Sequence, residues 1–220
     1  MYSIDVKDLA FGYKRQILSD SLNLKIHSGD YILVLGENGT GKSTLIKTLL
    51  GLLKPLGGEV VLNGLKKEDI GYLPQLFSLA PDFPATVYEV VISGNRPNFL
   101  CFYTKSEKKK CLEALQNFGI LDLKERAFSK LSGGQQEKVL LARAFVSNKK
   151  VLILDEPVTG LDDSARENMY KLINDLNKSG TTIIMISHDT TDALKYASHV
   201  LKLGANFYFG KKEDYENGTL

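Results

Sequence analysis

Residues 31–50, YILVLGENGTGKSTLIKTLL, contain the pattern that decides the fold of this chain. An apolar run at residues 32–35 stops at Gly36, and a helical pattern starts after Lys42. Between them lies the spacing G-x-x-x-x-G-K-S, in which glycines let several backbone N–H groups point into one concavity. The following helix directs the positive end of its dipole at the same place. A glycine-rich turn before a helix is the plainer interpretation, but strand, loop and helix together favour a phosphate-binding loop.

The polar side chains of this loop suit a nucleoside triphosphate with Mg²⁺. Lys42 adds a point charge suited to β- and γ-phosphates, and the Ser43 hydroxyl can ligate Mg²⁺. We therefore expect a nucleotide-binding site at residues 36–44.

Composition limits the possible functions. The 220 residues are enough for one large domain, or for one domain with an inserted lobe. A net charge of +2, from 28 basic and 26 acidic residues, argues against electrostatic binding of nucleic acid. Two cysteines without a C-x-x-C motif and three histidines without ligand spacing argue against a zinc or redox site and fit a reducing cytosol. No signal peptide and no apolar run of about 20 residues is visible, so we expect a soluble protein that can dock on a membrane partner.

The hydrophobic pattern predicts an α/β fold. Alternation at residues 2–13 and 22–27 is typical of half-buried antiparallel strands, and the apolar run at 151–154 is typical of a central parallel strand. Residues 181–186, rich in β-branched side chains, predict a second buried strand. Residues 86–147 are helical in pattern. We predict a P-loop NTPase core with a mixed, mainly parallel sheet, an N-terminal antiparallel strand region and an inserted helical subdomain. The single domain, 1–220, would divide into a core of residues 1–75 and 148–220 and a helical subdomain of residues 76–147.

Polar residues follow several predicted strands directly, namely Gly36, Gln75, Asp155 with Glu156, and His188. Carboxyl ends of parallel strands share one edge of a sheet, where ligands bind. Asp155 can hold Mg²⁺ or its water shell, and Glu156 can accept a proton from an attacking water. Adjacent acids can also be a turn feature, and a lone histidine is more often structural. Its place at this edge favours contact of His188 with the γ-phosphate.

A second informative stretch is LSGGQ at residues 131–135. Ser132 and Gln135 form a capping box, so a helix starts here. Gly133 and Gly134 are unfavourable in a first helical turn unless an anion approaches their N–H groups. Because the chain already has a phosphate-binding loop, this second anion site would serve a nucleotide held by another copy.

Taken together, these motifs resemble those of the ATP-binding-cassette ATPases over essentially the whole length. The matching stretches are GENGTGKST (Gly36, Glu37, Asn38, Gly39, Thr40, Gly41, Lys42, Ser43, Thr44), Gln75 after Leu73-Pro74, LSGGQ (131–135), VLILDEP (151–157), Gly160-Leu161-Asp162 and Ser187-His188. Mild departures are Glu137-Lys138, where the family often has Gln-Arg, and residues 158–160, where Ser-Ala is frequent before Leu-Asp.

The resemblance implies ATP and Mg²⁺ as cofactors and a head-to-tail dimer that encloses two ATP molecules. Each ATP would lie between residues 36–44 of one copy and Ser132, Gly133, Gly134 and Gln135 of the other. Tyr13, which the strand pattern leaves as either core or surface, would stack on adenine. Asp162 would lie in the dimer interface. The Mg²⁺ ligands would be Ser43, Gln75 and Asp155, and the catalytic residues Glu156 and His188.

Within the family, IGYLPQ, DFPATVYEVVISGN (82–95) and DEPVTGLD are similar to ATPase subunits of zinc/manganese-type importers. The resemblance implies ATP hydrolysis that powers divalent-metal import through separate membrane permease subunits, with a substrate-binding protein as indirect partner and no nucleic acid. The chain would lie in the cytoplasm, on the inner face of the cell membrane. The alternatives are another cargo or export, and a soluble ATP-switched module acting on nucleic acid or ribosomes. The absence of paired cassettes, the absence of long coiled-coil arms and the near-neutral charge disfavour the second.

Overall fold

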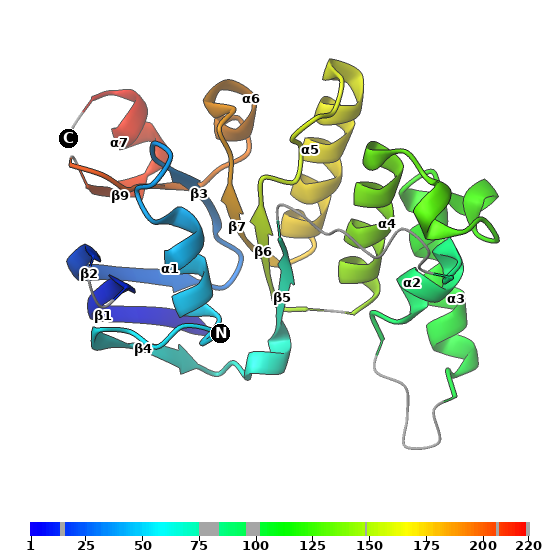
Figure 1. Cartoon of the computed structure of the whole chain (residues 1–220), viewed down its shortest axis with the longest axis horizontal. Coiled ribbons are helices and arrows are strands. Elements are labelled where there is room, and N and C mark those ends of the chain that lie inside the picture. The colour runs from blue at the N-terminus through cyan, green and yellow to red at the C-terminus, as the bar shows by residue number, and fades with distance from the viewer. Residues whose placement is uncertain (14–15, 75–83, 96–101, 148, 206, 219–220) are drawn as a thin grey trace.

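A six-stranded sheet forms the centre of the computed structural model, which describes residues 1–13, 16–74, 84–95, 102–147, 149–205 and 207–218 (Figure 1). In spatial order its strands are β5 (Ile70–Leu73), β6 (Val151–Asp155), β7 (Thr182–Ile186), β3 (Tyr31–Leu35), β8 (His199–Lys202) and β9 (Tyr208–Lys211). Neighbouring strands pair in parallel except β8 and β9, which pair antiparallel. The predicted α/β class with a mixed, mainly parallel sheet is confirmed.

A second sheet is antiparallel, with the order β2-β1-β4, and consists of β1 (Ser3–Tyr13), β2 (Gln16–His27) and β4 (Gly57–Asn63). The sequence predicted that the second strand starts at residue 22, but it starts at Gln16. Residues 16–21 lack a regular alternation because the β1–β2 register shifts between Leu9 and Gly12. Such irregularities in a strand pair hide a strand from pattern analysis.

The central strands are apolar throughout because both faces of the sheet are covered. In β3, Tyr31, Leu33 and Leu35 join one core, whereas Ile32 and Val34 join the other. The first core contains α2 (Val87–Ile92), α3 (Lys105–Asn117), α4 (Gly133–Val146) and α5 (Asp163–Lys178). The second contains α1 (Lys42–Leu49) and the inner faces of β1 and β2. Figure 1 accordingly places α2, α3 and α4 at one end of the molecule and α1 with the antiparallel sheet at the other.

The helical block begins with capped helices, as predicted. Thr86 caps α2, and Ser132 with Gln135 forms the capping box of α4. The remaining short elements are α6 (Thr190–Leu194), α7 (Lys212–Glu216) and the 3-10 turns η1 (Lys67–Asp69), η2 (Leu121–Leu123) and η3 (Phe128–Lys130). The predicted division into core and helical subdomain stays a prediction, and its boundary residues 75 and 148 lie outside the described residues.

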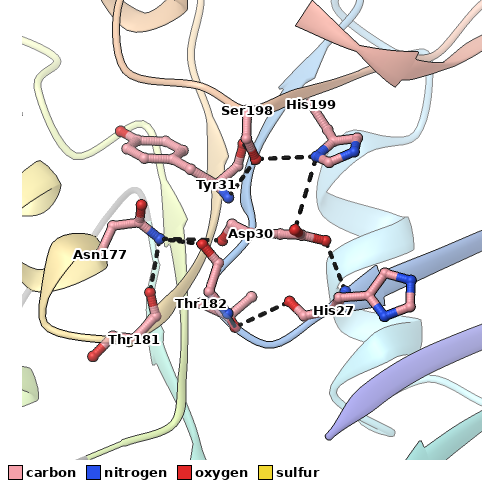
Figure 2. A network of polar contacts seen from close by, with 9 residues as sticks. His27, Asp30, Tyr31, Asn177, Thr181, Thr182, Ser198 and His199 are labelled. Carbon is pink, nitrogen blue, oxygen red and sulfur yellow. Dashed lines mark hydrogen bonds and ion pairs between the residues drawn. The ribbon is translucent and has the colours of Figure 1, made fainter. Parts of the chain in front are cut away.

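A polar network ties together the starts of the central strands, where β3, β7 and β8 enter the sheet (Figure 2). Asn177, near the end of α5, donates its side-chain N–H groups to the backbone oxygens of Gly29, Asp30 and Thr181, at 2.9, 3.3 and 2.9 Å. The Asp30 carboxylate accepts a hydrogen bond from the His27 backbone at 2.7 Å. This network anchors α5 and the turn before β3. The predicted functional residues lie at the other, carboxyl-terminal ends of the central strands.

Candidate functional site

The predicted phosphate-binding loop connects the buried strand β3 to α1. Gly36 and Gly41 have φ angles of 151° and 97°, in the region that favours glycine. A Cβ atom at Gly36 would lie 2.9 Å from the backbone oxygen of Leu203, so a side chain does not fit. Gly41 is the N-cap of α1 and supplies no side-chain cap. The first N–H groups of α1 are therefore left to be satisfied from outside the helix, as in anion sites.

Lys42 is folded back into this loop. Its ammonium donates to the backbone oxygens of Gly36 at 2.7 Å and Glu37 at 2.9 Å, and only 7% of the residue is exposed. Burial lowers the pKa of Lys42, whereas the carboxylates of Glu156 and Asp155 oppose this change. The loop thus holds a buried positive charge next to two acidic residues.

Asp155, the last residue of β6, lies across from Ser43 on α1. The Ser43 hydroxyl donates to Asp155 Oδ2 at 3.2 Å, and the Tyr72 hydroxyl of β5 lies 3.4 Å from the same oxygen. Burial raises the pKa of Asp155, and the hydrogen bond from Ser43 opposes the rise. Burial also raises the pKa of Tyr72 to about 12, so its phenol keeps its proton at neutral pH.

Glu156 has a φ angle of 54°, which is uncommon for a residue with a side chain and typical of functional sites. Its backbone N–H donates to the oxygen of Ile186 at 3.0 Å. Its carboxylate is held from two sides, with Oε1 2.7 Å from His188 Nε2 and Oε2 accepting from the Thr159 hydroxyl at 3.2 Å. The β6–β7 pairing therefore brings Glu156 and His188, which are far apart in sequence, into direct contact.

These groups face one cavity. It is lined by Tyr13, Leu18, Asn38, Gly39, Gly41, Lys42, Ser43, Thr44, Glu156 and His188. Tyr13 is 55% exposed, so the structure places it at the surface and not in the core. Glu37, Thr40 and Gly36 line an adjoining cavity that also includes His188. Asp155 is buried behind Ser43, and Gln75 lies outside the described residues.

Sequence reasoning missed three residues of this site. Leu18 lines the cavity, and a Cβ atom at Gly41 would lie 2.9 Å from its Cδ1. It belongs to the irregular start of β2, where no pattern signals a function. Tyr72 and Thr159 carry hydroxyls that contact the two acidic residues, and both lie within stretches quoted for the resemblance. Their hydroxyl groups, placed next to predicted strand ends, were the only sequence signal that could have indicated a role for them.

The glycine-rich stretch at residues 131–135 does not line this cavity. In Figure 1 its helix, α4, lies on the far side of α5 and β6 from α1. Ser132 and Gly133 are exposed, and a Cβ atom at Gly133 would meet nothing within 4 Å. Asp162, also exposed, is the N-cap of α5 and accepts from the Ala165 backbone at 2.8 Å. Within one chain, therefore, the exposed N-terminal turn of α4 does not face the phosphate-binding loop.

Comparison with known proteins shows to which family this chain belongs. The sequence profile of the ABC transporter family matches residues 19–159. The chain belongs to this ATP-binding-cassette family. It is 36% identical to the high-affinity zinc uptake system ATP-binding protein ZnuC of Bacillus subtilis (strain 168), over 92% of this chain and 91% of that protein. It is 35% identical to the zinc transport system ATP-binding protein AdcC of Streptococcus pneumoniae (strain ATCC BAA-255 / R6), over 94% and 92%.

A solved structure agrees with this assignment. A protein described as a metal-chelate type ABC transporter in an inward-facing conformation superposes with a TM-score of 0.86 at 31% identity, over 97% of this chain and 85% of that one. As an ABC ATPase subunit, the chain binds nucleotide and couples ATP hydrolysis to transport. ATPase subunits of ABC importers work with membrane permeases. None of the helices in the described part of the chain combines the length and the apolar composition that a membrane span requires.

Proposed function

We propose that this ABC ATPase drives the import of a divalent metal ion of the zinc or manganese type through separate membrane subunits. The observation that carries the proposal is the set of relatives matched over nearly their whole length. Besides ZnuC and AdcC, it includes the manganese transport system ATP-binding protein MntB of Bacillus subtilis (strain 168), at 34% identity over 92% of this chain and 84% of that protein. These matches extend beyond the phosphate-binding loop to the helical block.

The nucleotide would bind with its phosphates on residues 36–44 and its adenine against the exposed ring of Tyr13. Mg²⁺ fits the oxygen atoms present. Ser43 Oγ and Asp155 Oδ2 lie 3.2 Å apart, close to the roughly 2.9 Å between adjacent ligands of an octahedron with 2.0–2.1 Å bonds. Among the described residues, no three His, Cys, Asp or Glu side chains gather to hold a metal alone. Phosphate oxygens, water and Gln75 would supply the other ligands, and the ion would neutralise charge on the phosphates.

In hydrolysis, Glu156 would act as the general base. Its carboxylate would accept a proton from the water that attacks the γ-phosphate. His188, 2.7 Å from Oε1, and Thr159, 3.2 Å from Oε2, orient this carboxylate toward the cavity. Lys42, already buried in the loop, would move its charge from the loop carbonyls to the phosphates.

We further infer that the working unit is a head-to-tail dimer. The exposed N-terminal turn of α4, with Ser132, Gly133, Gly134 and Gln135, would complete the ATP site of the other copy. Asp162 would lie at the same interface. Mixing Lys42→Ala and Ser132→Arg proteins tests this arrangement, because each mixed dimer would contain one intact centre. We expect about a quarter of wild-type ATPase activity in the mixture and almost none in either variant alone. A mixture as inactive as its components would refute the shared site.

The cargo and the location require a test with membrane subunits. The chain would lie in the cytoplasm, on the inner face of the membrane, with a substrate-binding protein as indirect partner. We would capture it from detergent-solubilised cells, identify the attached permease and reconstitute both in liposomes. ATPase activity and uptake should rise with zinc- or manganese-loaded binding protein, and Glu156→Gln should abolish both. A permease with no metal response would overturn the proposed cargo but not the ATPase.

A second cargo has specific support. The superposed structure with the TM-score of 0.86 is described as a metal-chelate type transporter. The same liposomes should therefore be tested with free metal and with metal chelates. If the liposomes take up only the chelates, the cargo is a chelated metal ion and not a bare one.

A further inference from the structure

Tyr72 brings a second hydroxyl group to the carboxylate proposed to hold Mg²⁺. It lies in β5, the edge strand that pairs in parallel with β6, in register with Ile153. Two residues further along β6, Asp155 ends the strand. The Tyr72 hydroxyl lies 3.4 Å from Asp155 Oδ2, the same oxygen that accepts from Ser43 at 3.2 Å. Donors from β5 and α1 therefore converge on one oxygen atom.

The surroundings suit an orienting role. Tyr72 is half-buried and packs against the core between the sheet and α1, so its ring has a defined position. Asp155 is only 5% exposed, and a buried carboxylate depends on hydrogen bonds for both its orientation and its charge. Carboxylates that ligate metals are commonly held by such partners, whose loss weakens metal binding.

We propose that Tyr72 is a positioning residue for Asp155, and that its hydroxyl holds the carboxylate in the orientation that receives Mg²⁺ with ATP. This inference rests on the proposed role of Asp155 as a Mg²⁺ ligand. Tyr72 does not line the cavity that Lys42 and Glu156 face, and its hydroxyl contacts Asp155. It would therefore act through Asp155.

The test measures binding of the fluorescent analogue mant-ATP over a series of Mg²⁺ concentrations and in EDTA. In Tyr72→Phe, which keeps the ring, the half-maximal Mg²⁺ concentration should rise about tenfold, the low end of the range for such partners. Affinity in EDTA should not change. The matched control is Tyr2→Phe, since Tyr2 donates to the Lys150 oxygen at 2.6 Å and lies 2.9 Å from Thr182 Oγ1, at the opposite end of β6 and β7. It should leave the Mg²⁺ response unchanged.

Two more variants separate the possible outcomes. Asp155→Asn should remove the Mg²⁺ response, and if it does not, the proposed metal ligand fails and this inference with it. If Asp155→Asn removes the response while Tyr72→Phe stays within twofold of wild type, only the role of Tyr72 is overturned. Tyr72→Leu should match Tyr72→Phe in its Mg²⁺ response, because both lack the hydroxyl. A much larger shift in Tyr72→Leu, or an equal shift in Tyr2→Phe, would mean that the variants act through altered packing and not through the lost hydroxyl. Either result would also overturn the role of Tyr72.

Discussion

Glu137 is the side chain whose replacement should stabilise this protein in a pH-dependent way. It lies in α4, two residues after Gln135. Its Oε2 is buried and has no hydrogen-bond partner in the described part of the chain. Burial raises the pKa of Glu137 from 4.5 to about 7. We predict that Glu137→Gln raises the free energy of unfolding above pH 7 and has little effect near pH 5.

The size of the effect follows from the change in pKa. A rise of about 2.5 corresponds to about 3.4 kcal/mol, and solvent screening of a half-buried group reduces this to about 1.7 kcal/mol. The buried amide of glutamine retains part of the desolvation penalty, which leaves a gain of about 1 kcal/mol. Because the folded-state pKa is raised, the penalty is absent below pH 4.5, develops between pH 4.5 and 7, and is complete above pH 7.

Thermal unfolding followed by circular dichroism from pH 5 to 8.5 provides the assay. For a chain of this length, about 1 kcal/mol shifts the midpoint by about 2–4 °C, so Glu137→Gln should melt that much higher at pH 8.5. Glu125→Gln is the matched control, since the Glu125 side chain is 80% exposed in the same helical block. A gain of the same size at pH 5 and pH 8.5, or no gain at either, would refute the reasoning.

Three further predictions concern residues at the two ends of the central strands. Glu156→Gln should lower ATP turnover by roughly 10²–10⁴-fold, the usual worth of a general base, and trap an ATP-bound dimer; near-normal turnover in a phosphate-release assay would remove Glu156 from that role. Lys42→Ala should abolish mant-ATP binding or hydrolysis, and unchanged activity would contradict the phosphate-binding loop. Asn177→Ala should lose about 2 kcal/mol in urea unfolding, because its two N–H groups serve three backbone oxygens. Ser179→Ala, which removes one local bond to Leu176, is its control and should lose less than about 1 kcal/mol; equal losses would mean that the network of Figure 2 adds nothing.

The sequence by itself determined the features that depend on neighbouring residues. The loop at residues 36–41 follows from its glycines, since a side chain at Gly36 would meet Leu203. The starts of α2 and α4 follow from Thr86 and Ser132, whose hydroxyls accept from backbone N–H groups three residues on. The apolar run of β6 predicted a strand covered on both faces, as observed. Local hydrogen bonds and alternating burial act over a few residues, and a pattern can therefore reveal them.

Only the tertiary structure decided which distant side chains meet. The sheet order β5-β6-β7-β3 does not follow the chain, and it places Tyr72 beside Asp155 and Glu156 beside His188. The exposure of Tyr13 and the contact of Leu18 with the loop depend on an irregular pairing between β1 and β2 that no alternation signals. Strand order and register result from packing over the whole chain, and for that reason the hydroxyl groups that contact Asp155 and Glu156 became evident only in three dimensions.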